Sequence, residues 1–137
     1  MRGLATLIRL SRRQADEKRV ALAEAERQTL LGTEALAKHD AMARQETEHA
    51  RGQAEDMALW TTWAHIHTRQ RRQLAWGVGQ LQQQEAVARD ALRENFAEIK
   101  RLEIALEAAE ATAKRKVQRK KEQEAEDTEL RRPRQHA

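Results

Sequence analysis

The chain contains one proline, Pro133, near the end of its 137 residues. Proline breaks helices because it lacks a backbone N–H donor and clashes with the preceding turn. Residues 1–132 are instead rich in Ala, Glu, Arg, Gln, Lys and Leu, all of which are strong helix formers. Because nothing in that stretch forces a helix to stop, the sequence predicts very long helices. Function should then lie on surfaces along them rather than in an enclosed cleft.

The composition argues against a large packed core. Charged residues make up 35% of the chain and aromatic residues only 3%, and much of the apolar 39% is alanine. A seam between two helices needs an apolar residue only every three or four positions. We therefore expect an all-α fold, a single domain over residues 1–137 in which two long helices form an antiparallel coiled-coil hairpin.

The second half of the chain carries a clear stripe of residues spaced three and four apart, as in a coiled-coil seam. The stripe consists of Val78, Leu81, Glu85, Ala88, Leu92, Asn95 or Phe96, Ile99, Leu102, Leu106, Ala109 and Ala113. The first half has a looser stripe, interrupted by polar residues, each of which costs stability and can fix the register of the helices. It consists of Leu4, Leu7 or Ile8, Ser11, Ala15, Lys18, Leu22, Ala25, Thr29, Leu36, His39, Ala43, Glu46, Ala50, Met57 and Trp60.

A hairpin needs a turn, and glycines mark the candidate breaks because Gly weakens a helix interior. Residues 48–53 are polar, lack a large apolar side chain and contain a glycine. We expect a first helix over about 3–49, a turn over about 50–57, a second helix over about 58–125, and a frayed tail at 126–137. The first helix would pair with residues up to about 110. Gly32 is another candidate break, and a turn at 77–79 is the alternative that would give two unequal arms.

All three tryptophans of the chain fall within one short segment of the second helix. Two thin helices leave little room to bury several Trp, so some should be partly exposed, and exposed aromatic clusters mark interfaces. On one helical face lie Leu59, Trp63, Ile66 and Gln70, with Trp60 beside them. These five residues form a candidate partner surface. The alternative is that the tryptophans only close the end of the hairpin.

The net charge of +4 resides entirely in residues 114–137, which hold nine basic and five acidic side chains. The candidate docking residues are Lys114, Arg115, Lys116, Arg119, Lys120, Lys121, Arg131 and Arg132. The acidic residues among them would repel nucleic acid and anionic lipid, and no aromatic residue offers base stacking. A solvated helix of alternating charge and docking on an acidic protein surface are the better interpretations, with nucleic-acid binding as a third.

The sequence offers no arrangement suited to catalysis. His65 and His67 are two apart and point to different helix faces, while His39 and His49 lack a partner at the spacing of helical metal ligands. There is no cysteine, and Ser11 is the only serine. We therefore expect no enzymatic activity, no cofactor and no metal site.

No apolar run approaches the ~20 residues of a membrane-spanning helix. The first ten residues are too short and interrupted for a signal peptide, and the lack of cysteine fits a reducing compartment. We expect a cytoplasmic, monomeric protein that does not insert into the membrane.

Three segments resemble the FliJ family, small coiled-coil components of the flagellar type III protein export apparatus. They are an opening Leu4-Ala-Thr-Leu-Ile-Arg-Leu10 followed by Glu17-Lys18, a middle with Trp60, Trp63, Ile66 and Arg72-Gln-Leu74, and the ending Arg119-Lys-Lys-Glu-Gln123 through Asp127 to Arg131-Arg132. The last of these is the most specific. The chain departs from the family in having Trp and Leu where Tyr and Phe are usual.

The resemblance implies a non-catalytic stalk, similar to the central stalk of rotary ATPases. Its terminal ends would sit in the hexameric ring of the export ATPase, placing the basic candidates there. Its hairpin would contact the membrane export gate protein through the aromatic candidates, and it could escort empty export chaperones. The protein would lie peripherally at the cytoplasmic face of the inner membrane. The alternatives are a virulence-type III secretion counterpart and a coiled-coil scaffold with no ATPase partner.

Overall fold

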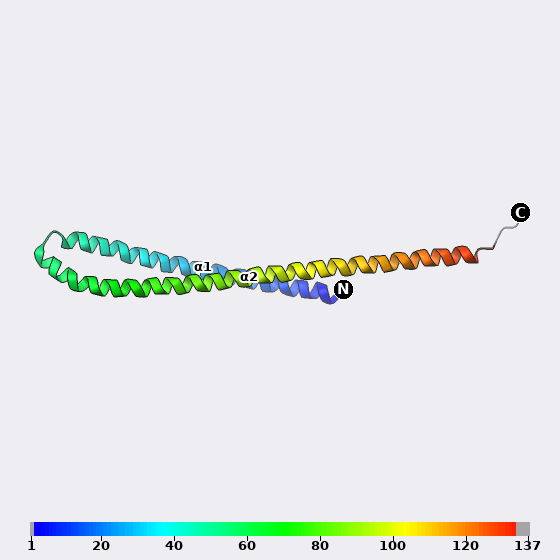
Figure 1. Ribbon diagram of the computed structural model, residues 1–137, viewed down its shortest axis with the longest axis horizontal. Helices are drawn as coiled ribbons and strands as arrows, with labels where there is room; N and C mark the ends of the chain where they lie inside the picture. The colour runs from blue at the N-terminus through cyan, green and yellow to red at the C-terminus, as the bar shows by residue number, and fades with distance from the viewer. Residues whose placement is uncertain (1, 134–137) are drawn as a thin grey trace. The chain divides into compact units, whose positions relative to one another are not determined.

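The computed structural model describes residues 2–133, and within them both elements are α-helices with no strand. Helix α1 spans Arg2–Ala50 and helix α2 spans Ala54–Arg131, joined by a short turn (Figure 1). The predicted all-α hairpin of two long helices is confirmed. The chain divides into two compact units. The first comprises α1 through Gln14 and α2 from Asn95 onward, and the second comprises Ala15–Glu94.

In the second unit, residues 15–50 of α1 run antiparallel to residues 54–94 of α2 (Figure 1). Ala15, Ala50 and Val78 are buried, and other seam positions at three-four spacing are half-buried. Gly32 belongs to this seam and does not break α1. A Cβ at Gly32 would lie 2.9 Å from Leu81 Cδ1 and 3.4 Å from Val78 Cγ2. The missing side chain therefore allows the two helices to approach closely.

In the first unit, the start of α1 packs against α2 through Ile8, Ser11, Asn95 and Ile99, all buried. The Asn95 Nδ2 group donates a hydrogen bond of 2.8 Å to the Ser11 carbonyl. The sequence left Asn95 and Phe96 as alternatives for this seam position. Asn95 occupies it, since Asn95 is 5% exposed and Phe96 40%.

Beyond Ala113 the first unit has no seam. Every residue from Lys114 to Pro133 is exposed, and this part of α2 extends past the N-terminal end of α1 (Figure 1). The expectation that pairing stops near residue 110 agrees with this pattern of burial.

The turn lies at residues 51–53, inside the predicted segment. The last turn of α1 is closed by bonds from the Gly52 and Gln53 amides to the carbonyls of His49 and Ala50, each 3.3 Å. The Gln53 carbonyl accepts the first bond of α2, from the Met57 amide at 3.2 Å. No glycine in the described residues has a positive φ. Gly52 therefore marks the break through its own weak helix propensity, not through a left-handed backbone.

The predicted helix boundaries need two corrections at α2. The helix begins at Ala54, earlier than the predicted 58, because Glu55 and Asp56 suit the positive end of its dipole. It runs to Arg131 instead of about 125, because no helix-breaking residue occurs between residue 125 and Pro133. The residue that precedes a proline is disfavoured in the helical conformation, so the helix ends just before Arg132. Residues 126–131 are thus helical, and the remaining tail residues 134–137 lie outside the described residues.

Helix α2 is continuous across Gly77 and Gly79, so the alternative turn at 77–79 is wrong. A Cβ at either glycine would meet nothing within 4 Å, which shows that neither is required by close packing. Neither described helix combines the length and apolar character needed to cross a membrane.

Candidate functional site

The predicted partner surface near the turn divides into two sets of side chains. Leu59 is 72% exposed and Ile66 is 51% exposed, so both present apolar surface outward. Trp60 and Trp63 are only half-exposed, and Gln70, although exposed, contacts α1. The helical face inferred from spacing is therefore not one continuous outward surface.

Trp60 and Trp63 are held by the hairpin itself. The Trp60 Nε1 group donates a 3.0 Å hydrogen bond to Thr47 Oγ1 on α1. The ring of Trp63 stacks on that of His67, with centroids 5.1 Å apart and planes 18° apart. These two tryptophans help to close the turn end of the hairpin, which was the structural alternative for them.

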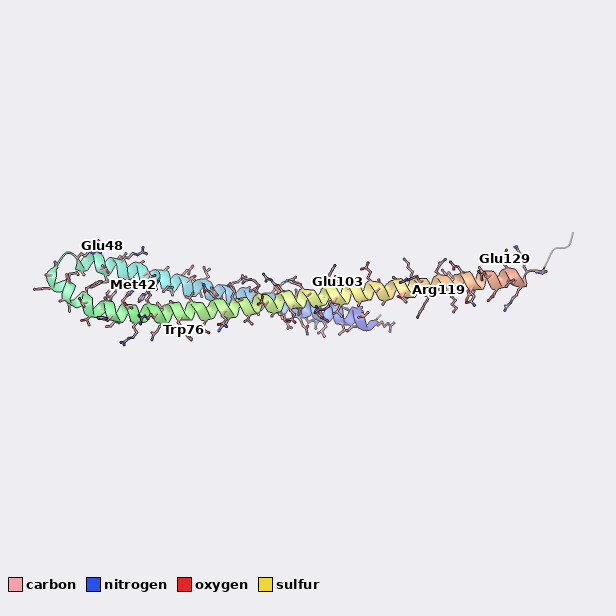
Figure 2. The ribbon with its side chains drawn as sticks, viewed as in Figure 1. Met42, Glu48, Trp76, Glu103, Arg119 and Glu129 are labelled. Carbon is pink, nitrogen blue, oxygen red and sulfur yellow. The ribbon has the colours of Figure 1, made fainter. Side chains whose placement is uncertain are left out.

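The third tryptophan is the one that the expected surface left out. Trp76 is 70% exposed and lies on the side of α2 that faces away from α1 (Figure 2). An outward position for it follows from the seam, since Leu74 and Val78 occupy the neighbouring inward positions. The seam would have identified Trp76 as exposed if the stripe had been extended back from residue 78.

An open groove lies beside the turn, with a volume of about 240 Å³. Its lining comes from the last turn of α1 and the first turns of α2: Glu46, His49, Ala50, Asp56, Leu59, Trp60 and Trp63. A lining that combines apolar and aromatic side chains with two carboxylates suits contact with a protein side chain better than chemistry on a small substrate.

A histidine pair spans the two helices in the second unit. The rings of His39 on α1 and His67 on α2 are parallel within 8°, with centroids 4.1 Å apart. Helical spacing within one helix, the only spacing considered from the sequence, did not identify this partner of His39 across the hairpin. His39 Nε2 also lies 3.1 Å from Gln70 Oε1.

Polar and charged groups surround this histidine pair. The Arg71 guanidinium binds Asp40 through Nε–Oδ1 at 2.9 Å and Nη2–Oδ2 at 3.4 Å. This hydrogen bonding holds the pKa of the Asp40 carboxyl below its usual value of 3.8. The pKa of His67 is also lowered from 6.5, first by burial and then by the nearby His39.

The sequence contained a signal for these cross-helix pairs. In an antiparallel hairpin, residues at equal distances from the centre of the turn lie opposite each other. Gln53 is midway between His39 and His67, and also midway between Ser11 and Asn95. With the turn fixed at 53 rather than spread over 50–57, both pairs could have been predicted.

The basic candidates lie on the unpaired part of α2, except Arg132, which follows the last residue of that helix. Lys114, Arg115, Lys116, Arg119, Lys120, Lys121, Arg131 and Arg132 are all exposed. Figure 2 shows the side chains of Arg119 and Glu129 on α2 with no second helix beside them. Local contacts here are within one helix, such as the bond from Gln118 Nε2 to Glu122 Oε1 at 3.3 Å. The charged groups are therefore accessible to a partner.

Comparison with known proteins adds no further assignment, because the chain matches no family model, no curated protein and no solved structure.

Proposed function

We propose that the chain is a non-catalytic stalk component of a type III protein export apparatus, of the kind found in the flagellar FliJ family. It would connect the export ATPase ring to the export gate protein at the cytoplasmic face of the inner membrane. Escort of export chaperones is a further role of the same kind. Its own contribution would be shape and contacts, while its partners hydrolyse ATP and move protein.

The observation that carries this proposal is the unpaired, charged stretch of α2 after Ala113. Residues 114–131 are helical and exposed, and at ~1.5 Å per residue they extend for about 27 Å. A single helix is narrow enough to enter the opening of a protein ring. Its seven basic side chains could pair with acidic residues there, and partner contacts would stabilise a helix that lacks tertiary support.

A second surface, near the turn, supports contact with another partner. Leu59 and Ile66 are exposed apolar residues one heptad apart on α2, so they lie on one side of the helix. Trp60 and Trp63 fix the adjoining groove through their contacts with Thr47 and His67. We assign this surface, together with Gln70, to the gate protein.

Charge reversal tests the assignment of the ATPase ring. Lys120→Glu with Lys121→Glu, made in the full chain, should reduce stimulation of ATP hydrolysis by the purified export ATPase by about tenfold or more, because two attractive contacts become repulsive. The matched control is Lys38→Glu, an exposed lysine on α1, which should stimulate like the wild type. Deletion of 114–137 should abolish stimulation altogether. Full stimulation by the deleted chain would reject the stalk assignment.

Truncation of the apolar pair tests the gate surface. Leu59→Ala with Ile66→Ala should weaken binding to the gate protein by about tenfold in a calorimetric titration, since two exposed apolar contacts are removed. Val87→Ala, at another outward position that is 63% exposed, should leave the affinity unchanged. Equal affinities for all three proteins would remove Leu59 and Ile66 from the interface.

Sedimentation distinguishes the stalk from a coiled-coil scaffold. A hairpin satisfies its seam within one chain and should sediment as a monomer, whereas a dimerising scaffold should form dimers. Dimers with no affinity for an export ATPase would favour the scaffold.

A further inference from the structure

Three potential metal ligands converge across the hairpin in the second unit. One ligand atom from each of His39, Asp40 and His67 lies within 4.8 Å of the other two. The first two residues are neighbours on α1, and the third comes from the facing turn of α2. All three are half-buried, so water reaches the cluster only in part.

One nitrogen of this cluster has an unsatisfied hydrogen-bonding capacity. His39 Nδ1 is buried and has no hydrogen-bond partner. A buried polar atom without a partner is unfavourable because it has lost its hydrogen bonds to water, and such atoms in native proteins call for an explanation. A metal ion on Nδ1 would provide one.

The other nitrogen of His39 already has the environment of a metal-binding histidine. Nε2 faces Gln70 Oε1 at 3.1 Å, and a carbonyl oxygen can only accept a hydrogen bond. With Nε2–H as the donor, the neutral ring carries its lone pair on Nδ1. Histidines that bind metals commonly donate their second N–H to an oxygen in this way, which fixes both tautomer and ring orientation.

Asp40 can supply an oxygen without leaving Arg71. Its carboxylate accepts from Arg71 at 2.9 Å and 3.4 Å, and each carboxylate oxygen has two lone pairs. The longer contact, at Oδ2, is the one more easily given up. The guanidinium charge nevertheless opposes a nearby cation, so Arg71 should weaken metal binding.

We propose that His39, Asp40 and His67 form a Zn²⁺ site that links the two helices near the turn. Two imidazoles and a carboxylate suit Zn²⁺ rather than Mg²⁺ or Ca²⁺, which prefer oxygen ligands. Water would complete a tetrahedral set. Nothing in this proposal depends on the export partners.

Binding requires a small rearrangement of the side chains. Zn–N distances of about 2.0–2.1 Å place two ligands of a tetrahedral ion roughly 3.3 Å apart. The present ligand atoms lie within 4.8 Å, so the stacked rings must turn toward a common point by about an ångström. We expect rotation about the side-chain bonds to bring the two rings to this point while the helices keep their positions.

Calorimetric titration of the full chain with ZnCl₂ tests the site. We expect one Zn²⁺ per chain and a thermal midpoint, followed by circular dichroism, that is higher with Zn²⁺ than with EDTA. His39→Gln with His67→Gln should lower the affinity by at least about a hundredfold and remove the thermal shift. The matched control is His65→Gln with His49→Gln, two exposed histidines outside the cluster, and it should bind like the wild type.

Two further variants distinguish this site from nonspecific binding by histidine. Arg71→Gln should tighten Zn²⁺ binding several-fold, because it removes a positive charge from beside Asp40. Gln70→Leu should weaken binding by about tenfold through loss of the hydrogen bond to His39. Both variants keep His39 and His67, so a change in affinity reports on the geometry around them.

Co²⁺ in place of Zn²⁺ gives a readout that a change in folding would not produce. The wild type should show the intense visible absorption of tetrahedral cobalt, and the His39 and His67 double variant should not. Undetectable Zn²⁺ binding by the wild type at millimolar concentration would overturn the proposal. Equal affinity of wild type and the double variant would overturn it as well.

Discussion

Residues 54–94 and residues 114–131 belong to the same helix and use the same helix-forming residue types, yet they differ in what surrounds them. The first stretch lies beside α1, and its seam positions are buried or half-buried. In the second stretch every residue is exposed. Helix propensity is shared by both, so the difference in stability between them should come from the seam.

The paired stretch also carries contacts that composition does not predict. Trp60 and Arg71 of α2 form polar contacts with Thr47 and Asp40 of α1, and the ring of His67 stacks on that of His39. All six residues lie within positions 39–71, on the two sides of the turn. Polar and aromatic contacts are directional, so they help to fix the register of the two helices in this region. The exposed stretch has no such contacts to α1, and its charged side chains are available to partners.

The same Val→Asp substitution in the two stretches should give the largest difference in the free energy of unfolding. Val78→Asp puts a carboxylate into the seam, where Val78 is 8% exposed, and should lower the free energy of unfolding by about 3 kcal/mol. Val117→Asp, at a residue 55% exposed, should change it by less than about 0.5 kcal/mol. Urea denaturation measures both, and equal losses would contradict the assignment of the two environments.

Two isoleucines of the first unit allow buried and exposed positions to be compared within one paired segment of α2. Ile99 is 9% exposed and Ile104 is 55% exposed. Ile99→Ala should cost about 2 kcal/mol, at the low end for core truncation because the seam is narrow. Ile104→Ala should be almost neutral, since it loses little contact and gains helix propensity. A larger loss at Ile104 than at Ile99 would show that α2 is rotated from the described orientation.

Replacing a glycine within a helix by alanine should change the stability by an amount that depends on the space around the new Cβ. Gly77→Ala and Gly79→Ala should each stabilise by about 0.5–1 kcal/mol, because a Cβ there meets open space. Gly32→Ala should gain less, since the tip of Leu81 must move away from the new Cβ. The thermal midpoints of the three variants rank their stabilities. If Gly32→Ala had the highest midpoint, the two helices would not approach each other closely at Gly32.

His67 should make the paired stretch sensitive to acid, because its pKa is lowered in the folded chain. The pKa of the His67 imidazole is lowered from 6.5 in the folded chain. Well above pH 6.5 this imidazole is therefore neutral in both the folded and the unfolded state. Below pH 6.5 the unfolded chain binds the proton more readily, so stability falls as pH falls. His39 and Arg71 oppose a charge on His67, and Asp40 favours it.

Denaturation in EDTA at pH 7.5 and at pH 5.5 measures this small effect. His67→Gln should reduce the loss of stability between the two pH values, while His65→Gln should leave it as in the wild type. An unchanged loss in His67→Gln would assign the acid sensitivity to other groups.

Much of the fold was predictable from the sequence because it depends on residue spacing. The stripe from Val78 to Ala113 identified the buried positions of α2, and the polar segment around Gly52 located the turn. The end of α2 was predicted too early, because lack of an apolar stripe was read as loss of helix. Pro133 was the stronger signal for that boundary.

The candidate sites were less predictable because they depend on which residues face each other across the hairpin. A shift of a few residues in the turn changes every such pair, so partners of His39 were sought only by spacing within one helix, which missed the stack on His67. Exposure of the basic residues was easier to predict, since no stripe accompanies them.

The pairing of α1 with residues 54–94 of α2 is the central claim, and a distance between spin labels tests it most directly. The chain has no cysteine, so Leu30→Cys with Gln80→Cys, two exposed positions, provides a unique pair of labels. With helix axes about 8–10 Å apart, pulsed electron paramagnetic resonance should give a label distance of roughly 20–35 Å. A distance near 75 Å, the span of fifty residues in one continuous helix at ~1.5 Å each, would contradict the hairpin.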